Sequence, residues 1–131
     1  YRGATDPAID GVDTRLQLAG ESGLDDLLWA DVVILGTPEN FGYMSGAMKD
    51  FLDRTYYPAQ GLVEGMGYAL FVSAGNDGTG AVRAIRRIAL GYPLKEIVAP
   101  IIVRGEVHAS NLEACQELGM TVAAGLELGM F

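Results

Sequence analysis

The stretch VVILGTPENFGYMSGAMKDFLDR, residues 32–54, contains the pattern that decides the fold. It opens with four apolar residues, Val32–Leu35, three of which are β-branched. A short, unbroken apolar run of this kind is typical of a parallel strand that is buried on both faces. The next residues, Thr37–Tyr43, are polar, glycine-containing and aromatic, and apolar residues then recur at helical spacing. The stretch therefore predicts a strand, a loop and a helix at Ser45–Arg54.

The same alternation continues on both sides of this stretch. Further strands are predicted at Val12–Leu16, Tyr68–Val72 and Ile97–Val103, and further helices at Leu24–Ala30, Ala81–Leu90 and Asn111–Leu128. Strands that alternate with helices indicate a parallel sheet with helices on both faces. Pro100 interrupts the last apolar run, and proline is tolerated mainly at edges or bulges. The last strand is therefore predicted at a sheet edge.

Composition fits one domain over residues 1–131 and excludes several classes of partner. The chain carries 9 basic and 17 acidic residues, a net charge of −8, with no large cluster of Lys and Arg. This balance argues against binding to nucleic acid and to anionic membranes. The apolar runs are far too short to span a membrane. A single cysteine excludes an internal disulfide framework and favours a cytoplasmic protein.

Two loops follow successive predicted strands, Thr37–Tyr43 and Ala74–Gly80. Ligands of open α/β sheets bind beyond the carboxyl ends of the strands. Both loops are rich in Gly, Asn and Asp, and glycine lets the backbone approach a planar ligand closely. Phe41 and Tyr43 are suited to stacking on a ring. Either loop alone is a common kind of turn, but two at successive strand ends favour a binding site.

Residues 37–54 resemble the flavin-binding segment of flavodoxin-like oxidoreductases, a group that includes the NADPH-dependent FMN reductases and the quinone reductases. The shared pattern is T-P-E, then glycine, a small-residue helix start and a Met-Lys-Asp run. The resemblance implies a three-layer, doubly wound parallel sheet of strand order 2-1-3-4-5. It also implies FMN as cofactor, NAD(P)H as co-substrate, and electron transfer to a quinone or another small acceptor. A homo-oligomer is also expected.

In this family the isoalloxazine ring of FMN lies between the two loops. The implied cofactor-binding residues are Thr37, Pro38, Glu39, Asn40, Phe41, Gly42 and Tyr43 in the first loop, and Ala74, Gly75, Asn76, Asp77 and Gly78 in the second. No catalytic side chain is assigned, because the flavin itself performs the redox step. No metal site is expected, because His108 is the only histidine.

The resemblance further implies a first strand and a phosphate-binding loop, and nothing before Val12 fits either of them. Residues 1–131 are therefore interpreted as one flavodoxin-like domain that is incomplete at its N-terminus. The lacking strand 1 belongs in the centre of the sheet. We expect a gap wide enough for one strand between Val12–Leu16 and Val32–Leu35, which should not pair directly.

Three other functions share parts of this pattern. A flavodoxin-type electron carrier has the same fold, but an aromatic ring usually covers its flavin, and the second loop contains none. A Rossmann unit built on Gly75, Gly78 and Gly80 departs from the G-x-G-x-x-G spacing. A signalling receiver domain needs an acceptor Asp at the end of the third strand, where Gly36 and Thr37 stand.

Three arginines, Arg83, Arg86 and Arg87, lie on the predicted helix after the second loop. They are able to meet a phosphate of NADPH. A solvated helix face is the more ordinary arrangement, because arginine is usually exposed. The sequence leaves both interpretations open.

Overall fold

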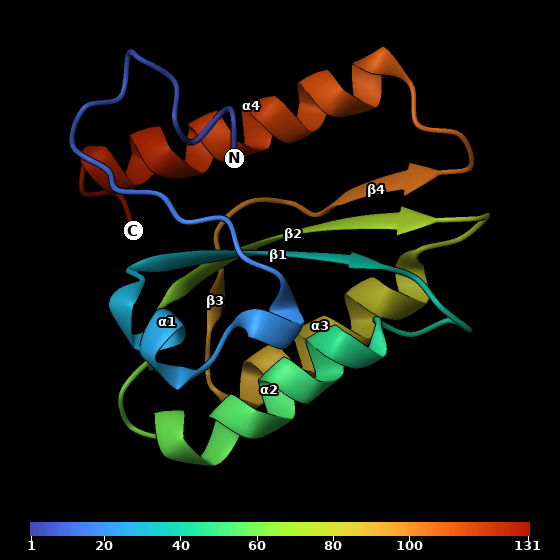
Figure 1. The fold of residues 1–131 in the computed structure, drawn as a ribbon, viewed down its shortest axis with the longest axis horizontal. Helices are drawn as coiled ribbons and strands as arrows, with labels where there is room; N and C mark the ends of the chain where they lie inside the picture. The colour runs from blue at the N-terminus through green and yellow to red at the C-terminus, as the bar shows by residue number, and fades with distance from the viewer.

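A parallel sheet forms the middle layer of the computed structural model, which describes residues 1–131 (Figure 1). The strands are β1 (Val32–Pro38), β2 (Gly67–Ala74), β3 (Lys95–Glu96) and β4 (Ile101–Arg104). Strand β2 lies in the centre and pairs in parallel with β1 on one side and with both β3 and β4 on the other. Strand β4 is the second half of the predicted strand Ile97–Val103, and the predicted edge position is confirmed. The first half is wrong: residues 97–100 form no strand, and β3 lies just before them.

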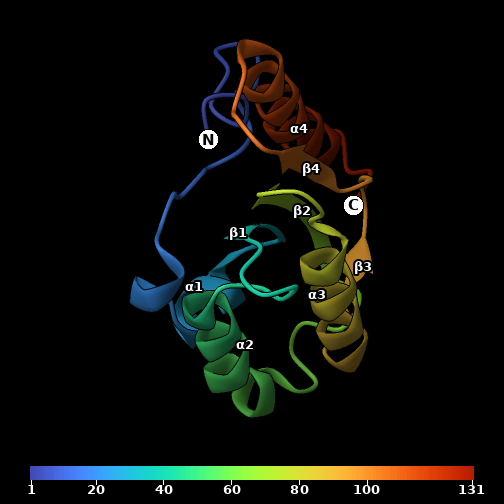
Figure 2. The same cartoon turned by 90° about the vertical axis from the view of Figure 1, so that its right-hand side faces the viewer.

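Helices cover both faces of this sheet, as the alternating pattern predicted (Figure 2). On one face lie α1 (Leu24–Trp29), α2 (Gly46–Ala59) and α3 (Thr79–Gly91), and on the other lies α4 (Ala109–Glu127). The short 3-10 helix η1 (Ala19–Glu21) precedes α1. No helix has the length and apolar content needed to cross a membrane.

The main core lies between the sheet and the helices α2 and α3. Its most deeply buried large side chains include Leu70, Val72 and Ile85. A smaller cluster of Ala69, Leu118 and Val122 joins the other face of β2 to α4. Burial on both faces explains why β2 reads as an unbroken apolar run.

The predicted strand at Val12–Leu16 is wrong for this structure. The segment is extended, but it joins no ladder, and no amide of residues 12–18 donates to a backbone oxygen. Side chains hold it instead: the Arg15 guanidinium lies 3.8 Å from the centre of the Trp29 ring and 3.7 Å from the Asp26 carboxylate. A strand requires a hydrogen-bonded neighbour, and none lies beside this segment.

A cavity of about 690 Å³ separates this extended segment from β1. Residues 12–17 line one wall, residues 32–36 line the opposite wall, and Val122, Ala123 and Leu126 of α4 close one side. Strand β1 pairs only with β2, so its other edge faces the cavity. The expected gap is therefore present, and the two segments do not pair directly.

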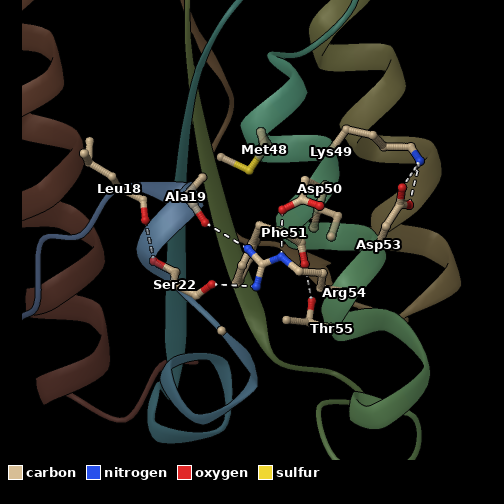
Figure 3. Close-up of polar contacts among 12 residues, drawn as sticks. Leu18, Ala19, Ser22, Met48, Lys49, Asp50, Phe51, Asp53, Arg54 and Thr55 are labelled. Atoms are coloured by element: carbon tan, nitrogen blue, oxygen red, sulfur yellow. Dashed lines mark hydrogen bonds and ion pairs between the residues drawn. The ribbon is translucent and has the colours of Figure 1, made fainter.

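Arg54 attaches the end of the extended segment to α2 (Figure 3). Its Nη1 and Nη2 atoms donate to the carbonyl oxygens of Ser22 and Ala19 at 3.0 and 3.3 Å, and its Nε atom donates to Asp50 at 2.7 Å. These contacts connect the turn around η1 to the helix that follows the first loop. The contacts are exposed, so they define position more than they add stability.

Candidate functional site

The two predicted loops leave the sheet at the same edge. Register pairs Thr37 with Val72 and Pro38 with Ser73, so β1 and β2 end side by side. Immediately after this pair, the Glu39 amide donates to the Ser73 carbonyl oxygen at 2.8 Å. The expectation that both loops open at one edge is confirmed. Their role as two walls of a flavin site stays a prediction.

Glu39 joins the two loops through its carboxylate. Its Oε1 atom accepts from the Gly78 amide at 2.9 Å, and its Oε2 atom accepts from the Ala81 amide at 3.2 Å. Gly78 is the N-cap of α3 and has no side chain that could cap the helix. A negative group is favourable there because the first amides of a helix lack partners and the helix dipole is positive at that end. The Glu39 side chain therefore positions the second loop.

The backbone of the first loop also packs directly on α3. A Cβ atom added to Gly80 would lie 2.2 Å from the Gly42 carbonyl oxygen, so no larger residue fits without movement. Sequence reasoning assigned no such role to Gly80. The available signal was a glycine in the first turn of a helix, where alanine would be more stable.

The tip of the first loop is a tight turn that exposes Phe41. The Asn40 amide donates to the Tyr43 carbonyl at 2.8 Å, and the Tyr43 amide donates back to Asn40 at 3.0 Å. Phe41 and Gly42 both have positive φ angles, 52° and 71°, as a two-residue type I′ turn requires. Phe41 is the only non-glycine residue with positive φ, and its side chain is 107% exposed. An unfavourable backbone that holds an apolar ring in solvent is typical of a ligand-contacting position.

The twelve predicted site residues divide into a buried base and an exposed rim. Thr37, Ala74 and Gly78 are buried. The Thr37 hydroxyl accepts from the Ser45 amide at 2.9 Å, and this hydrogen bond joins the start of the first loop to the start of α2. Glu39 is half-buried between the loops. The exposed residues are Pro38, Asn40, Phe41, Gly42 and Tyr43 in the first loop, and Gly75, Asn76 and Asp77 in the second.

Five amides of the exposed rim have no protein acceptor. They belong to Phe41 and Gly42 in the first loop and to Gly75, Asn76 and Asp77 in the second. Backbone amides are strong donors that rarely remain without a partner once they are removed from water. These exposed donors are therefore free to bind the acceptor atoms at the polar edge of a heterocycle.

Asp77 fixes the shape of the second loop. Its Oδ1 atom accepts from the Thr79 hydroxyl at 2.7 Å and from the Thr79 amide at 3.2 Å. These hydrogen bonds from Thr79 lower the pKa of the Asp77 carboxyl below its ordinary value. On the other side of the loop, the Arg104 Nε atom donates to the Asp77 carbonyl oxygen at 2.7 Å. The second loop is thus held at its C-terminal end, through both the side chain and the backbone of Asp77.

Comparison with known proteins identifies the family. The profile described as "NADPH-dependent FMN reductase" matches residues 19–112, which include both loops and the helices that follow them. The chain belongs to this family. It is therefore part of a flavin-dependent oxidoreductase, and FMN is its cofactor, as the resemblance of residues 37–54 implied.

Two curated proteins extend this comparison. A flavodoxin of Aquifex aeolicus is 34% identical over 132 residues, covering 88% of this chain and 71% of the relative. An NAD(P)H dehydrogenase (quinone) of Syntrophus aciditrophicus is 28% identical over 104 residues. That match covers 76% of this chain and only 51% of the relative, so the chain spans about half of that protein.

Solved structures confirm the flavodoxin-like fold. A flavodoxin from the domain Archaea superposes with a TM-score of 0.68 at 22% identity, covering 83% of this chain and 74% of that one. A flavodoxin, WrbA-like protein from Agrobacterium tumefaciens superposes with a TM-score of 0.64 at 19% identity, covering 76% and 68%. At these identities the similarity establishes the fold alone.

Proposed function

We propose that this chain forms the flavin site of an oxidoreductase that passes electrons from NAD(P)H to a quinone or another small acceptor. The observation that carries the proposal is the pair of loops joined by Glu39 at one sheet edge, with unpartnered amides on both. FMN supplies the redox chemistry when it is bound. The protein supplies position, hydrogen bonds and access to one face of the ring.

The residues of the two loops fit the isoalloxazine ring. Free amides of residues 41–42 and 75–77 would donate to its polar edge, and the exposed rings of Phe41 and Tyr43 would contact a ring face. Pro38 and Asn40 shape the entry and the turn of the first loop, while Thr37, Ala74 and Gly78 form the base beneath the ring.

An open ring face supports an enzyme over a carrier. The second loop contributes Gly75, Asn76 and Asp77 to the rim and contains no aromatic residue. A nicotinamide must approach the flavin to about 3–3.5 Å for electron transfer as a hydride equivalent. Short side chains at this position leave room for that approach.

Covering this face tests the proposal. Asn76→Trp should slow flavin reduction by nicotinamide at least tenfold while weakening FMN binding much less, because the amide of residue 76 remains. Gln60→Trp adds the same ring at an exposed position at the far end of α2 and should change neither quantity. Stopped-flow reduction and FMN fluorescence titration measure the two effects. Equal loss of both quantities in the Asn76 variant would argue against an open face.

The relative named flavodoxin favours a second candidate, an electron carrier without its own nicotinamide oxidation. The net charge of −8 is compatible with that role. A carrier would receive electrons from a partner protein, whereas the enzyme would receive them directly from NAD(P)H.

We also propose that residues 1–131 are one incomplete domain, completed by a further strand in the cavity beside β1. The one-sided pairing of β1 and the extended, unpaired segment 12–17 on the opposite wall support this. In the full-length protein, all amides of residues 32–36 should then resist hydrogen exchange. An exchange pattern in which alternate amides of β1 are unprotected would mean that β1 remains an edge strand.

We also propose that the protein is a homo-oligomer and that it is located in the cytoplasm. Exposed Tyr57, Leu62 and Leu90 near the ends of α2 and α3 are apolar side chains available for a homo-oligomer contact. The single cysteine is compatible with a cytoplasmic location.

A further inference from the structure

The charge of the protein is strongly uneven along the chain. Residues 79–104 contain five basic residues and one acidic residue, Glu96. Subtracting these from the totals of 9 and 17 leaves four basic and sixteen acidic residues elsewhere, so this segment carries +4 and the remainder −12. The segment comprises α3, β3 and β4, and it begins directly after the second loop.

A hollow of about 360 Å³ lies between α3 and β4 in this basic segment. Its lining combines apolar side chains with a hydroxyl and two guanidinium groups: Val82, Pro100, Ile102, Thr79, Arg83 and Arg86. The volume is within the range of about 300–1,000 Å³ that is usual for small-molecule sites. An apolar floor beside positive charge suits a ligand with a flat ring and a phosphate.

The arginines of this segment differ in how far they are engaged. Arg83 and Arg86 line the hollow, whereas Arg104 lies outside its lining and contacts the second loop at Asp77. Arg86 donates from Nε and Nη2 to the two oxygens of Glu96, at 2.8 and 2.7 Å, so its charge is largely balanced. Arg83 makes no hydrogen bond or ion pair with the protein, and Arg104 uses only its Nε atom, on the Asp77 carbonyl. The nearby Asp77 carboxylate is itself occupied by Thr79. The charges of Arg104 and Arg83 add to the lowering of the Asp77 pKa, so both guanidinium groups lie near this carboxylate. Their other N–H donors make no hydrogen bond with the protein and remain available to an anion.

The hollow borders the proposed flavin site. Thr79, on its rim, directly follows Gly78, the last residue of the second loop. A Cβ atom on Gly78 would lie 2.4 Å from the Cγ2 atom of Ile102, which lines the hollow. The proposed ring site therefore lies on the side of the second loop that faces the first loop. The hollow lies on the side that faces β4.

We propose that this hollow binds the 2′-phosphoadenosine part of NADPH, with Arg83 and Arg104 holding the 2′-phosphate and the apolar floor contacting adenine. The inference rests on the proposed function, because it places the distant half of the nicotinamide substrate. Guanidinium groups bind phosphates through paired, charge-assisted hydrogen bonds. NADH lacks this phosphate, so Arg83 and Arg104 determine the preference for NADPH.

Binding of nucleotide fragments tests this site without any redox readout. Full-length, FMN-loaded protein is titrated calorimetrically with 2′,5′-ADP, with 5′-AMP and with inorganic phosphate. We expect 2′,5′-ADP to bind at least tenfold more tightly than 5′-AMP. Arg83→Gln and Arg104→Gln should each weaken 2′,5′-ADP binding about tenfold, the effect of losing one charge-assisted contact at a partly exposed site. Arg87→Gln, on the same helix but outside the hollow, should leave the affinity unchanged.

Three results would overturn the assignment: equal affinity for 2′,5′-ADP and 5′-AMP, unchanged affinity in both the Arg83 and Arg104 variants, or inorganic phosphate binding as tightly as 2′,5′-ADP. Failure of this site and failure of the proposed function are distinguishable. Protein that is reduced equally by NADH and NADPH and ignores 2′,5′-ADP lacks this site but keeps the function. Protein that binds 2′,5′-ADP through Arg83 and Arg104 has the site, even if neither nicotinamide reduces its flavin.

Discussion

Replacing Glu39 with alanine is expected to destabilise the protein by about 2 kcal/mol and to weaken FMN binding at least tenfold. The carboxylate accepts hydrogen bonds from Gly78 and Ala81, so its loss leaves two amides without partners and α3 without a cap. It also removes the side-chain link between the second loop and the first. Urea denaturation measures the first effect and FMN fluorescence titration the second.

Two further variants sharpen this test. Glu39→Gln retains one acceptor oxygen but turns an NH2 group toward a backbone amide, so we expect an intermediate loss. Glu64→Ala removes an exposed carboxylate that makes no hydrogen bond or ion pair, and its effect should stay within about 0.5 kcal/mol. Normal FMN affinity in a destabilised Glu39→Ala protein would mean that the hydrogen bonds of Glu39 to Gly78 and Ala81 stabilise the fold without shaping the flavin site.

Gly80→Ala is expected to have the second large effect. The new methyl group would occupy space 2.2 Å from the Gly42 carbonyl oxygen, so the first loop must move away from α3. Forcing an extra group into a close-packed contact typically costs about 1–3 kcal/mol. Because Gly42 and Phe41 form the exposed tip of the proposed site, FMN affinity should fall together with stability.

Gly46→Ala provides the matched control. Gly46 is also a glycine in the first turn of a helix, but no atom lies within 4 Å of its added Cβ and its φ is not positive. That substitution should stabilise the protein by about 0.4–1 kcal/mol, because alanine lowers the conformational entropy of the unfolded chain. If Gly80→Ala behaved like Gly46→Ala in urea and in FMN titration, the contact between the first loop and α3 would not constrain the site.

The sequence predicted the elements whose signals are local. Strands β1 and β2 appear as short apolar runs. Helix α2 starts at its predicted position, where Ser45 is the N-cap and its hydroxyl accepts from the Met48 amide. Both loops were predicted at the carboxyl ends of the strands because each directly follows a predicted strand. These features depend on neighbours in the chain, which the sequence displays directly.

The features that failed or were missed depend on distant partners. Residues 12–16 have an alternating pattern, yet a strand forms only beside another strand, and a cavity lies where that neighbour would be. The Glu39–Gly78 hydrogen bond joins residues 39 positions apart, and the Gly80–Gly42 contact joins residues on two different elements. Neither contact leaves a periodic signal. The sequence also does not show that Arg86 pairs with Glu96 while Arg83 stays unpaired; only the folded structure shows which arginine is engaged.

Anaerobic stopped-flow mixing of FMN-loaded, full-length protein with NADPH, and separately with NADH, tests the proposed function most directly. We expect the flavin absorption band near ~450 nm to bleach with at least one nicotinamide at millimolar concentration, and turnover to begin when a quinone is added. If neither nicotinamide bleaches the band while a reduced partner protein does, the result contradicts an enzyme and identifies an electron carrier.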